Sequence, residues 1–265
     1  QSDVLSNPLG THSIEEAIYC GTSQGEVFPP EFAWGYSNTN YSILAMIIEE
    51  VSGLSYENFL AQNIIDPLNL TNTEIPTTPQ INGSHMGCYW NIGSWIDLTI
   101  IHSSTYTGWA DVVSNADDLN VFYKNLLDGN LISQASLTKM KTIYPGSFDY
   151  GFGLDFYLLD GHDYYGHSGE VANTSSMFFA DVNTTLTPNG YYLTYNFNMQ
   201  GAEMANAVDI PVYNLLNNVA SQSIENSIEK QEFTLFPNPV SKNNLLTIKS
   251  DKKGKCSFFD LHGKI

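Results

Sequence analysis

Two short groups of polar residues in this sequence carry side chains that are suited to proton transfer. Tyr-Ser-Asn occupies positions 36–38, directly before an amphipathic segment, and His-Ser-Gly-Glu occupies positions 167–170. A phenol and an imidazole that face one site can together handle the proton of a nucleophilic hydroxyl. Glycine lets a substrate approach the backbone closely, so the N–H that follows it can face a bound carbonyl oxygen. These residue types therefore allow proton transfer beside a carbonyl group.

Each of these residues also has a structural interpretation. Tyr36 can be an ordinary turn aromatic, and the serine and asparagine that follow it are good helix caps because their side-chain oxygens accept backbone N–H groups. His167 can be a core histidine. A triad of Asp163, His167 and Ser168 is excluded, because neighbours on a strand point to opposite faces and His167 cannot serve Ser168.

The other histidines lack the spacing that metal sites use. They stand at positions 12, 85, 102, 162 and 262, and none of them belongs to a His-Glu-x-x-His pattern. We therefore expect no catalytic metal and no cofactor.

Hydrophobic periodicity predicts helices in the first half of the chain. Leu44, Ile47, Ile48 and Val51 fall on one helical face, and Gly53 can end that helix in the left-handed conformation. The segment 71–108 is polar and reads as a long loop rather than regular structure. Helices are expected at 13–19, 37–51, 55–65 and 114–129, from Ser133 onward, and at 201–219, where Pro211 should kink or split the last one.

From Tyr150 the hydrophobic period changes to two, which is typical of strands. Strands are expected at 150–159, 164–169, 173–182 and 190–199, with shorter ones at 233–236, 245–250 and 255–261. Helices, an antiparallel sheet and a further helix predict an α+β fold in which helices flank an antiparallel sheet. The tail strands predict a small all-β module at the C-terminal end, which the resemblance described below implies to be partial.

Charge is distributed unevenly and indicates a domain boundary near Glu229. The net charge is −18, with −22 in residues 1–229 and +4 in residues 230–265. Such an acidic body repels phosphate backbones, so we expect no nucleic-acid partner. No apolar run is long enough to span a membrane. Cys20 and Cys88 can pair in an oxidising compartment or remain buried thiols, and the sequence leaves both possibilities open.

Four stretches, taken in order, resemble the serine β-lactamase-related superfamily, which includes class C β-lactamases, D,D-peptidases and esterases. They are "YSNTNYSILAMIIEEVSGLSYENFLAQNIIDPLNL", "GWADVVSNADDLNVFYKNLLDGNLIS", "YGFGLDF" and "YYGHSGEVANTSSMFFAD". The resemblance covers residues 10–220. It implies acylation of a serine that is activated by a lysine one helical turn later, in a Ser-x-x-Lys motif.

The resemblance also implies a role for each candidate residue. Tyr36 would take part in proton transfer, and Asn38 would hydrogen-bond the substrate or the lysine. His167 stands where many relatives have lysine, and Ser168 where they have threonine or serine. The N–H of Glu170, with Gly169 beside it, would border the oxyanion hole.

One element of the family pattern is missing from the expected place. No Ser-x-x-Lys precedes Tyr36, and the matches at 136–139, 227–230 and 250–253 are expected to be coincidental. We therefore expect the sequence to be a fragment that starts after the nucleophile helix and is inactive alone.

The tail resembles a second family. "FTLFPNPVSKNNLLTIKSDKKGKCSFFDLHGKI" is similar to the C-terminal sorting domain of type IX secretion cargo in Bacteroidota. This implies a hydrolase domain at 1–222, a linker at 223–231 and a partial sorting domain at 232–265. It also implies a secreted or cell-surface location, with the type IX secretion machinery as partner.

Together these features predict a serine hydrolase of esterase or D,D-peptidase type. Its substrate would be a small-molecule or peptide ester or amide. The alternative is a non-catalytic cleft-binding or cell-surface protein that derives from the same fold.

Overall fold

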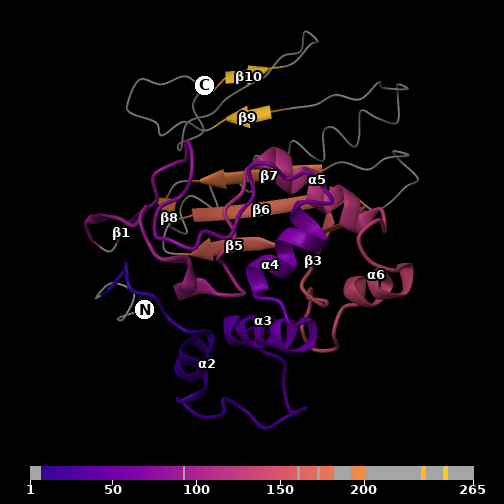
Figure 1. Ribbon diagram of the computed structural model, residues 1–265. Coiled ribbons are helices and arrows are strands. Elements are labelled where there is room, and N and C mark those ends of the chain that lie inside the picture. Colours follow the sequence, from indigo (N-terminus) through magenta and orange to yellow (C-terminus); the bar gives the residue numbers. More distant parts are fainter. Residues whose placement is uncertain are drawn as a thin grey trace.

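The computed structural model of the chain, drawn in Figure 1, describes residues 7–91, 93–159, 162–171, 174–181, 192–197, 199–200, 234–236 and 247–249. Within these residues helices accompany antiparallel strands, which confirms the predicted α+β class. In the tail, β9 (Thr234–Phe236) pairs antiparallel with β10 (Thr247–Lys249). The expected helix at 201–219, the linker and the strand at 255–261 lie outside the described residues, so the domain boundary stays a prediction.

The main sheet is antiparallel throughout its described pairings. Its strands all come from the part of the chain where the hydrophobic period is two. They are β3 (Asp155–Leu159), β4 (His162–Gly166), β5 (Ser168–Val171), β6 (Thr174–Asp181) and β7 (Tyr192–Phe197).

Strands β4 and β5 are two halves of one interrupted strand. On β6, Ala180 lies opposite Tyr165 and Met177 lies opposite Ser168, so both halves keep the same register. The expectation of a continuous strand at 164–169 is therefore wrong at His167, which occupies the break. Alternation of side chains continues across a break of this kind, so the sequence pattern did not predict it.

The helices of the first half confirm the predicted ones to within a few residues. The predicted helix at 55–65 divides into an α-helical and a π-helical turn. The elements are α2 (Ile14–Thr22), α3 (Asn38–Ser52), α4 (Tyr56–Leu60), η1 (Ala61–Ile65), α5 (Ala116–Leu127) and α6 (Gln134–Lys141).

Capping residues explain where these helices begin and end. Ser13 and Glu16 form a reciprocal capping box at the start of α2. The side chain of Asn115 accepts from a backbone N–H in the first turn of α5. Gly53 ends α3 with φ at 70°, in the left-handed conformation that favours glycine, as predicted. Ser37 occupies the N-cap of α3, although its side chain makes no capping hydrogen bond.

Helix α3 does not bury the face that its apolar residues define. Val51 is 82% exposed, and Leu44 and Ile47 are also exposed, whereas Ser42 and Ala45 are buried. The small side chain of Ala45 lets α3 approach the backbone of Gly108, where a Cβ atom would meet Tyr41 O at 2.6 Å. Helix α3 therefore packs through its small residues, and the backbone at Gly108 lies close against it.

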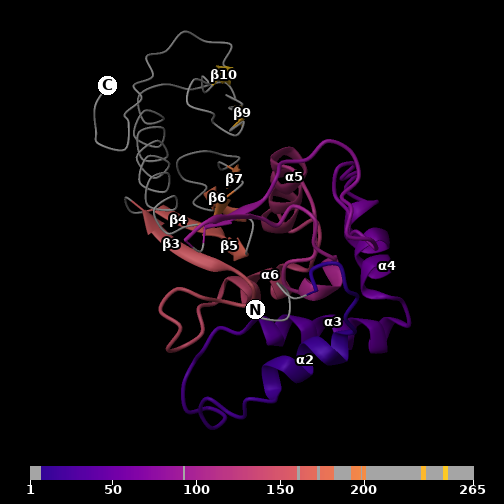
Figure 2. The ribbon, with the colours of Figure 1, turned by 90° about the vertical axis from the view of Figure 1, so that its left-hand side faces the viewer.

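A compact core joins the last two helices of the first half to the start of the sheet. Its buried residues are Tyr123 and Leu127 on α5, Leu137 on α6, and Leu154 next to β3. Thr194 on β7 donates a hydrogen bond of 2.7 Å to Asn120 on α5. Figure 2 shows α5 lying beside the sheet, with α2 and α3 farther from it. This core holds the sheet against the helices.

The segment 71–108 is more ordered than its composition predicts. It contains β1 (Tyr89–Asn91), β2 (Trp95–Asp97) and the 3₁₀-helix η2 (Ser103–Tyr106). β1 pairs antiparallel with β2 and parallel with β8 (Met199–Gln200), which lies far along the chain. This long-range pairing supplies backbone partners that a local sequence pattern cannot reveal.

Two further expectations are decided within the described residues. Cys20 is a free thiol at the surface, whereas Cys88 is buried, so the two do not form a disulfide. No helix in the described part of the chain is both long and apolar enough to cross a membrane.

Candidate active site

Tyr36 and Asn38 stand at the start of α3. Tyr36 precedes the N-cap residue and is 48% exposed, and Asn38 is the first residue of the helix and is also exposed. Within the described residues, neither side chain has a hydrogen-bond partner. Both polar groups are therefore available to a bound molecule.

The second group lies where the interrupted strand changes from β4 to β5. His167 Nδ1 is 2.6 Å from the carbonyl oxygen of Ser168, and the N–H of Ser168 donates to Asp155 Oδ2 at 3.2 Å. Gly169 and Glu170 follow on β5, opposite Ser176 and Ser175 of β6. The break in the strand thus places an imidazole at the edge of the sheet.

The backbone at this edge offers one further donor. The N–H of Ser168 points to Asp155, away from β6. In an antiparallel strand successive N–H groups point to alternate sides, so the N–H of Glu170 points to the same side as that of Ser168. This is the orientation that the predicted oxyanion-hole role of Glu170 requires.

The fold brings the two groups together in an aromatic cluster. The ring centroids of Tyr36 and His167 are 6.1 Å apart. Tyr150 lies 5.6 Å from each of these rings, edge-on to both. Tyr41 packs 5.8 Å from Tyr36, and Trp34 packs 5.7 Å from Tyr150. We call these five residues the aromatic cluster. The catalytic roles assigned to Tyr36, Asn38 and His167 stay predictions.

Hydrogen bonds link three members of the cluster. The hydroxyls of Tyr41 and Tyr150 are hydrogen-bonded to each other, and Tyr150 Oη is 2.9 Å from His167 Nε2. Sequence reasoning missed Tyr41 and Tyr150. The available signal was weak: Tyr150 is the first residue of the "YGFGLDF" stretch, and Tyr41 lies within the first of the four resembling stretches.

Burial keeps the phenols of the cluster protonated. It raises the pKa of Tyr36 to about 12, and the nearby Tyr41 and Asp155 act in the same direction. Burial also raises the pKa of Tyr41 and, together with its hydrogen bond to Tyr41, that of Tyr150. At neutral pH these groups are therefore hydrogen-bond donors. Tyr36 needs a nearby positive charge before it can accept a proton readily.

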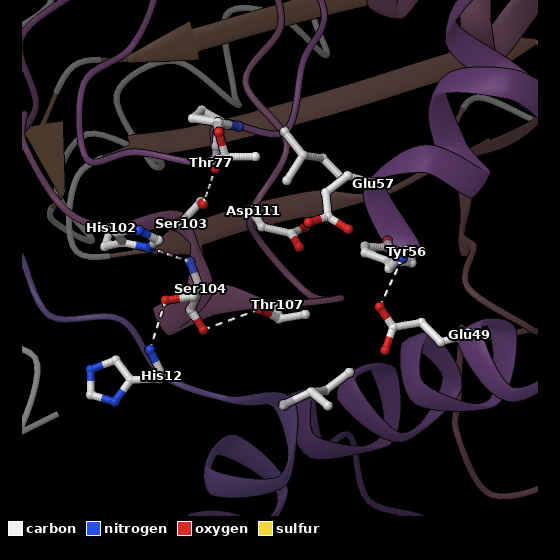
Figure 3. Close-up of a pocket in the computed structure, with 13 residues that line it drawn as sticks. His12, Glu49, Tyr56, Glu57, Thr77, His102, Ser103, Ser104, Thr107 and Asp111 are labelled. Atoms are coloured by element: carbon white, nitrogen blue, oxygen red, sulfur yellow. Dashed lines mark hydrogen bonds between the residues drawn. The ribbon is translucent and has the colours of Figure 1, made fainter. Parts of the chain in front are cut away.

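A separate polar cavity of about 260 Å³ lies between α3, α4 and the segment around η2 (Figure 3). None of the five residues of the aromatic cluster lines it. Its wall is rich in carboxylates, hydroxyls and imidazoles, from His12, Glu49, Tyr56, Glu57, Thr77, His102, Ser103, Ser104, Thr107 and Asp111. Within the described residues, no three acidic, histidine or cysteine side chains form a group that could hold a metal ion.

Asp111 is the most perturbed acid of this cavity. It is 5% exposed, and its Oδ2 accepts a hydrogen bond of 2.9 Å from the N–H of Gly108. Burial raises its pKa to about 6, against the opposing effect of that hydrogen bond, and the charge of Glu57 raises it further. The carboxylate of Glu57 lies beside Asp111 in Figure 3. Asp111 thus changes charge within a moderately acidic range.

The Ser-x-x-Lys match at 136–139 has a structural explanation. Ser136 lies in the first turn of α6, where its N–H donates to Oγ of the N-cap residue Ser133 at 3.1 Å. Its hydroxyl is 3.0 Å from the same Oγ, and the residue is exposed. Ser136 therefore belongs to a capped surface helix, which agrees with its interpretation as a coincidental match.

Known proteins resemble this chain over most of the described fold. The PbpX protein of Bacillus subtilis is 31% identical over 186 residues, which cover 69% of this chain and 45% of that protein. A D-aminopeptidase of Brucella ovis is 28% identical over 153 residues, which cover 54% of this chain and 28% of that protein. The structure of a D-stereospecific amidohydrolase from Streptomyces sp. superposes with a TM-score of 0.68 and 28% identity, covering 74% of this chain and 59% of that one.

The chain thus spans less than half the length of the PbpX protein and of the D-aminopeptidase. The family model described as Beta-lactamase matches residues 12–217, which include both candidate groups and the strands that carry His167. On this match, and with the α+β fold described above, the chain belongs to the Beta-lactamase family.

Proposed function

We propose that this chain contributes the Tyr-x-Asn and His-x-Gly parts of a serine hydrolase that cleaves an amide through an acyl-serine. One observation carries the proposal: Tyr36 and His167, far apart in the sequence, lie with their ring centroids 6.1 Å apart. A phenol that can move a proton then lies beside the imidazole of the His-x-Gly group, whose backbone N–H at Glu170 is proposed to stabilise an oxyanion. Membership of the Beta-lactamase family supports the same reaction class.

The nucleophile in this proposal is a Ser-x-x-Lys pair carried by residues outside this sequence. The electrostatics of Tyr36 support such a partner. With a pKa of about 12, Tyr36 keeps its proton at neutral pH, and an adjacent ammonium group would lower that pKa and favour the phenolate, which can accept a proton. The lysine would thus activate the serine and prepare Tyr36 for proton transfer.

The substrate class proposed is the amide of a D-amino acid or a peptide that contains one. A D-stereospecific amidohydrolase and a D-aminopeptidase are among the relatives at 28% identity, and this supports an amide more than an ester. An ester is the second candidate, because the acyl-serine chemistry is the same for both.

The test compares two proteins with one reagent. The 265-residue chain and a longer product of the same gene, extended upstream, are each incubated with a fluorophosphonate probe. We expect the extended protein to be labelled at a single upstream serine and to hydrolyse a D-amino-acid amide faster than its L-enantiomer. Replacing that serine by alanine is the matched control and should abolish both.

The chain by itself should remain unlabelled. Labelling with turnover at Ser136, or at any other serine within 1–265, would refute the assignment of the nucleophile. An extended protein that binds amides but neither labels nor turns over would support the non-catalytic alternative.

We propose in addition that the parent protein is exported through type IX secretion. The supporting observation is the "FPNPV" and "DLHGKI" sequence of the tail. The measurement is the location of the full-length protein in its own cells, with and without a functional type IX apparatus. If cells that lack the apparatus still released the protein into the medium, the proposal would be contradicted.

A further inference from the structure

We propose that Tyr150 is a positioning residue that strengthens the Nδ1–H tautomer of His167 by donating to its other ring nitrogen, and that Tyr41 supports it in this task. The residues involved are the three hydrogen-bonded members of the aromatic cluster. The consequence for reactivity rests on the proposed function, whereas the tautomer itself is a property of this chain.

Both ring nitrogens of His167 are already engaged by the protein. Nδ1 is 2.6 Å from the carbonyl oxygen of Ser168, and Nε2 is 2.9 Å from the hydroxyl of Tyr150. A carbonyl oxygen can only accept a hydrogen bond, so Nδ1 must carry the proton and donate it. In the neutral ring Nε2 is then an acceptor, and the Tyr150 hydroxyl donates to it.

The direction of the remaining hydrogen bond follows from this assignment. Because the single hydroxyl proton of Tyr150 points to His167, the bond between the two phenols must be donated by Tyr41. The chain of donors therefore runs from Tyr41 to Tyr150 to His167 and ends at the carbonyl of Ser168. A pKa of Tyr150 raised by burial agrees with its role as a donor.

The backbone around Tyr150 is held in place on both sides. Ser147 is 2% exposed, and its hydroxyl is 2.7 Å from the carbonyl oxygen of Tyr150 and accepts from the Tyr150 N–H at 3.1 Å. The next residue, Gly151, has no room for a side chain, since a Cβ atom would lie 2.3 Å from Met140 O. A turn built in this way places the Tyr150 hydroxyl accurately, as a positioning role requires.

The three residues come from separate parts of the fold. Tyr41 lies on α3, Tyr150 lies in the turn before β3, and His167 lies at the break between β4 and β5. Both ring nitrogens of His167 are engaged by Tyr150 and Ser168, so neither is free to exchange a proton with the substrate. His167 therefore serves to hold these two residues in position. That exchange falls to Tyr36, whose hydroxyl makes no hydrogen bond within the described residues.

The tautomer can be read in the 265-residue chain by NMR of its ¹⁵N-labelled imidazole rings. The signals of His167 are assigned from a His167→Gln variant. We expect neutral His167 to be in the Nδ1–H form, whereas an imidazole free in water prefers the Nε2–H form. In Tyr150→Phe the donor to Nε2 is lost, while the Ser168 carbonyl still accepts from Nδ1. The Nδ1–H form should therefore stay the major one, and the fraction of the Nε2–H form should rise.

Two further variants separate hydrogen bonding from packing. Tyr41→Phe should cause a smaller change in the same direction, because Tyr150 loses the group that orients its hydroxyl. Tyr36→Phe is the matched control: its ring also packs on His167, but its hydroxyl does not bind the imidazole, so the tautomer should not change. Wild-type His167 in the Nε2–H form would overturn the proposal even if Tyr150→Phe failed to fold.

A second measurement relates the tautomer to catalysis in the extended protein. Tyr150→Phe should lower kcat about tenfold, the effect of one lost hydrogen bond near 1.4 kcal/mol, with KM nearly constant. Failure here, with the expected NMR result, would contradict the link to catalysis and leave the positioning of His167 intact. An unchanged Nε2 signal and an unchanged tautomer fraction in folded Tyr150→Phe would contradict the inference and leave the proposed hydrolase standing.

Discussion

Burial raises pKa values in both the aromatic cluster and the polar cavity, but it changes the charge near neutral pH only in the cavity. In the cluster, burial raises the pKa of phenols that are already neutral at pH 7, so their charge does not change. In the cavity, burial raises the pKa of Asp111 to about 6, so this carboxyl loses its proton in a physiologically relevant range. The phenols of the cluster thus stay neutral near pH 7, whereas the charge of Asp111 in the cavity is sensitive to pH.

Gly108 lies where the two regions meet. Its N–H donates to Asp111 in the cavity, and its Cα faces the backbone carbonyl of Tyr41 on α3. The side chain of Tyr41 belongs to the cluster. The difference between the regions shows that closeness in space does not give buried groups the same function. A neutral network suits positioning, whereas a single buried carboxyl suits a response to protonation.

The largest expected effect concerns the cluster. In the extended enzyme, Tyr36→Phe should reduce kcat about 10²–10⁴-fold, the usual contribution of a positioned acid or base, or about 3–5 kcal/mol of barrier. The ring contacts remain, Tyr36 is half exposed and its hydroxyl has no hydrogen-bond partner within the described residues, so the melting temperature should change little. Measuring kcat and the melting temperature on the same variant checks this. A lower melting temperature with unchanged turnover would make Tyr36 a turn aromatic.

The next effect belongs to the cavity. The folded-state pKa of Asp111 lies at about 6, above its ordinary value of 3.8, so the folded state binds the proton more tightly than the unfolded state. This contribution to stability is complete below pH 3.8 and is lost as pH rises through about 6. Its full size is about 3 kcal/mol, at about 1.4 kcal/mol per pKa unit.

The variant that tests this contribution is Asp111→Asn. It should remove much of the decline in stability between pH 4 and 6.5 and raise stability at pH 7, measured by urea unfolding. The exposed Asp117→Asn on α5 is the control, and we expect it to keep the wild-type pH profile. A decline that persists in Asp111→Asn would assign it to another group.

A smaller effect is expected where the two regions meet. Gly108→Ala places a Cβ atom 2.6 Å from Tyr41 O at a φ of +84°, so we expect a loss of about 1–3 kcal/mol. Gly25→Ala is a matched control, with a φ of +83° and nothing within 4 Å. The difference between the two melting temperatures measures the close approach alone. Equal losses would show that α3 and the 108 backbone are not tightly packed.

The smallest expected effect tests whether the wall of the cavity can be loosened while the aromatic cluster stays unchanged. Ser13→Ala removes the N-cap of α2, beside the cavity residues His12 and Ile14, and should cost about 1 kcal/mol. Hydrogen exchange should increase in α2, and the ¹⁵N signals of His167 should stay unchanged. A shift of those signals would show that the two regions are coupled.

Local interactions explain what was predictable from the sequence. Gly53 and Ser13 mark helix ends because left-handed glycine and the capping box involve only near neighbours in the chain. The α+β class followed from a change of hydrophobic period at Tyr150. The order of the Tyr-Ser-Asn and His-Ser-Gly groups indicated the family, which the match over 12–217 established.

Only the tertiary structure decided which side chains meet. Tyr41 and Tyr150 were missed because their hydrogen bond joins residues 109 positions apart, and no local pattern records such a contact. The strand break at His167 leaves the alternation of side chains unchanged, so it is silent in the sequence. The buried positions of α3 are the small residues Ser42 and Ala45, which allow the close backbone approach at Gly108. Such contacts are non-local, and they exist only once the chain has folded.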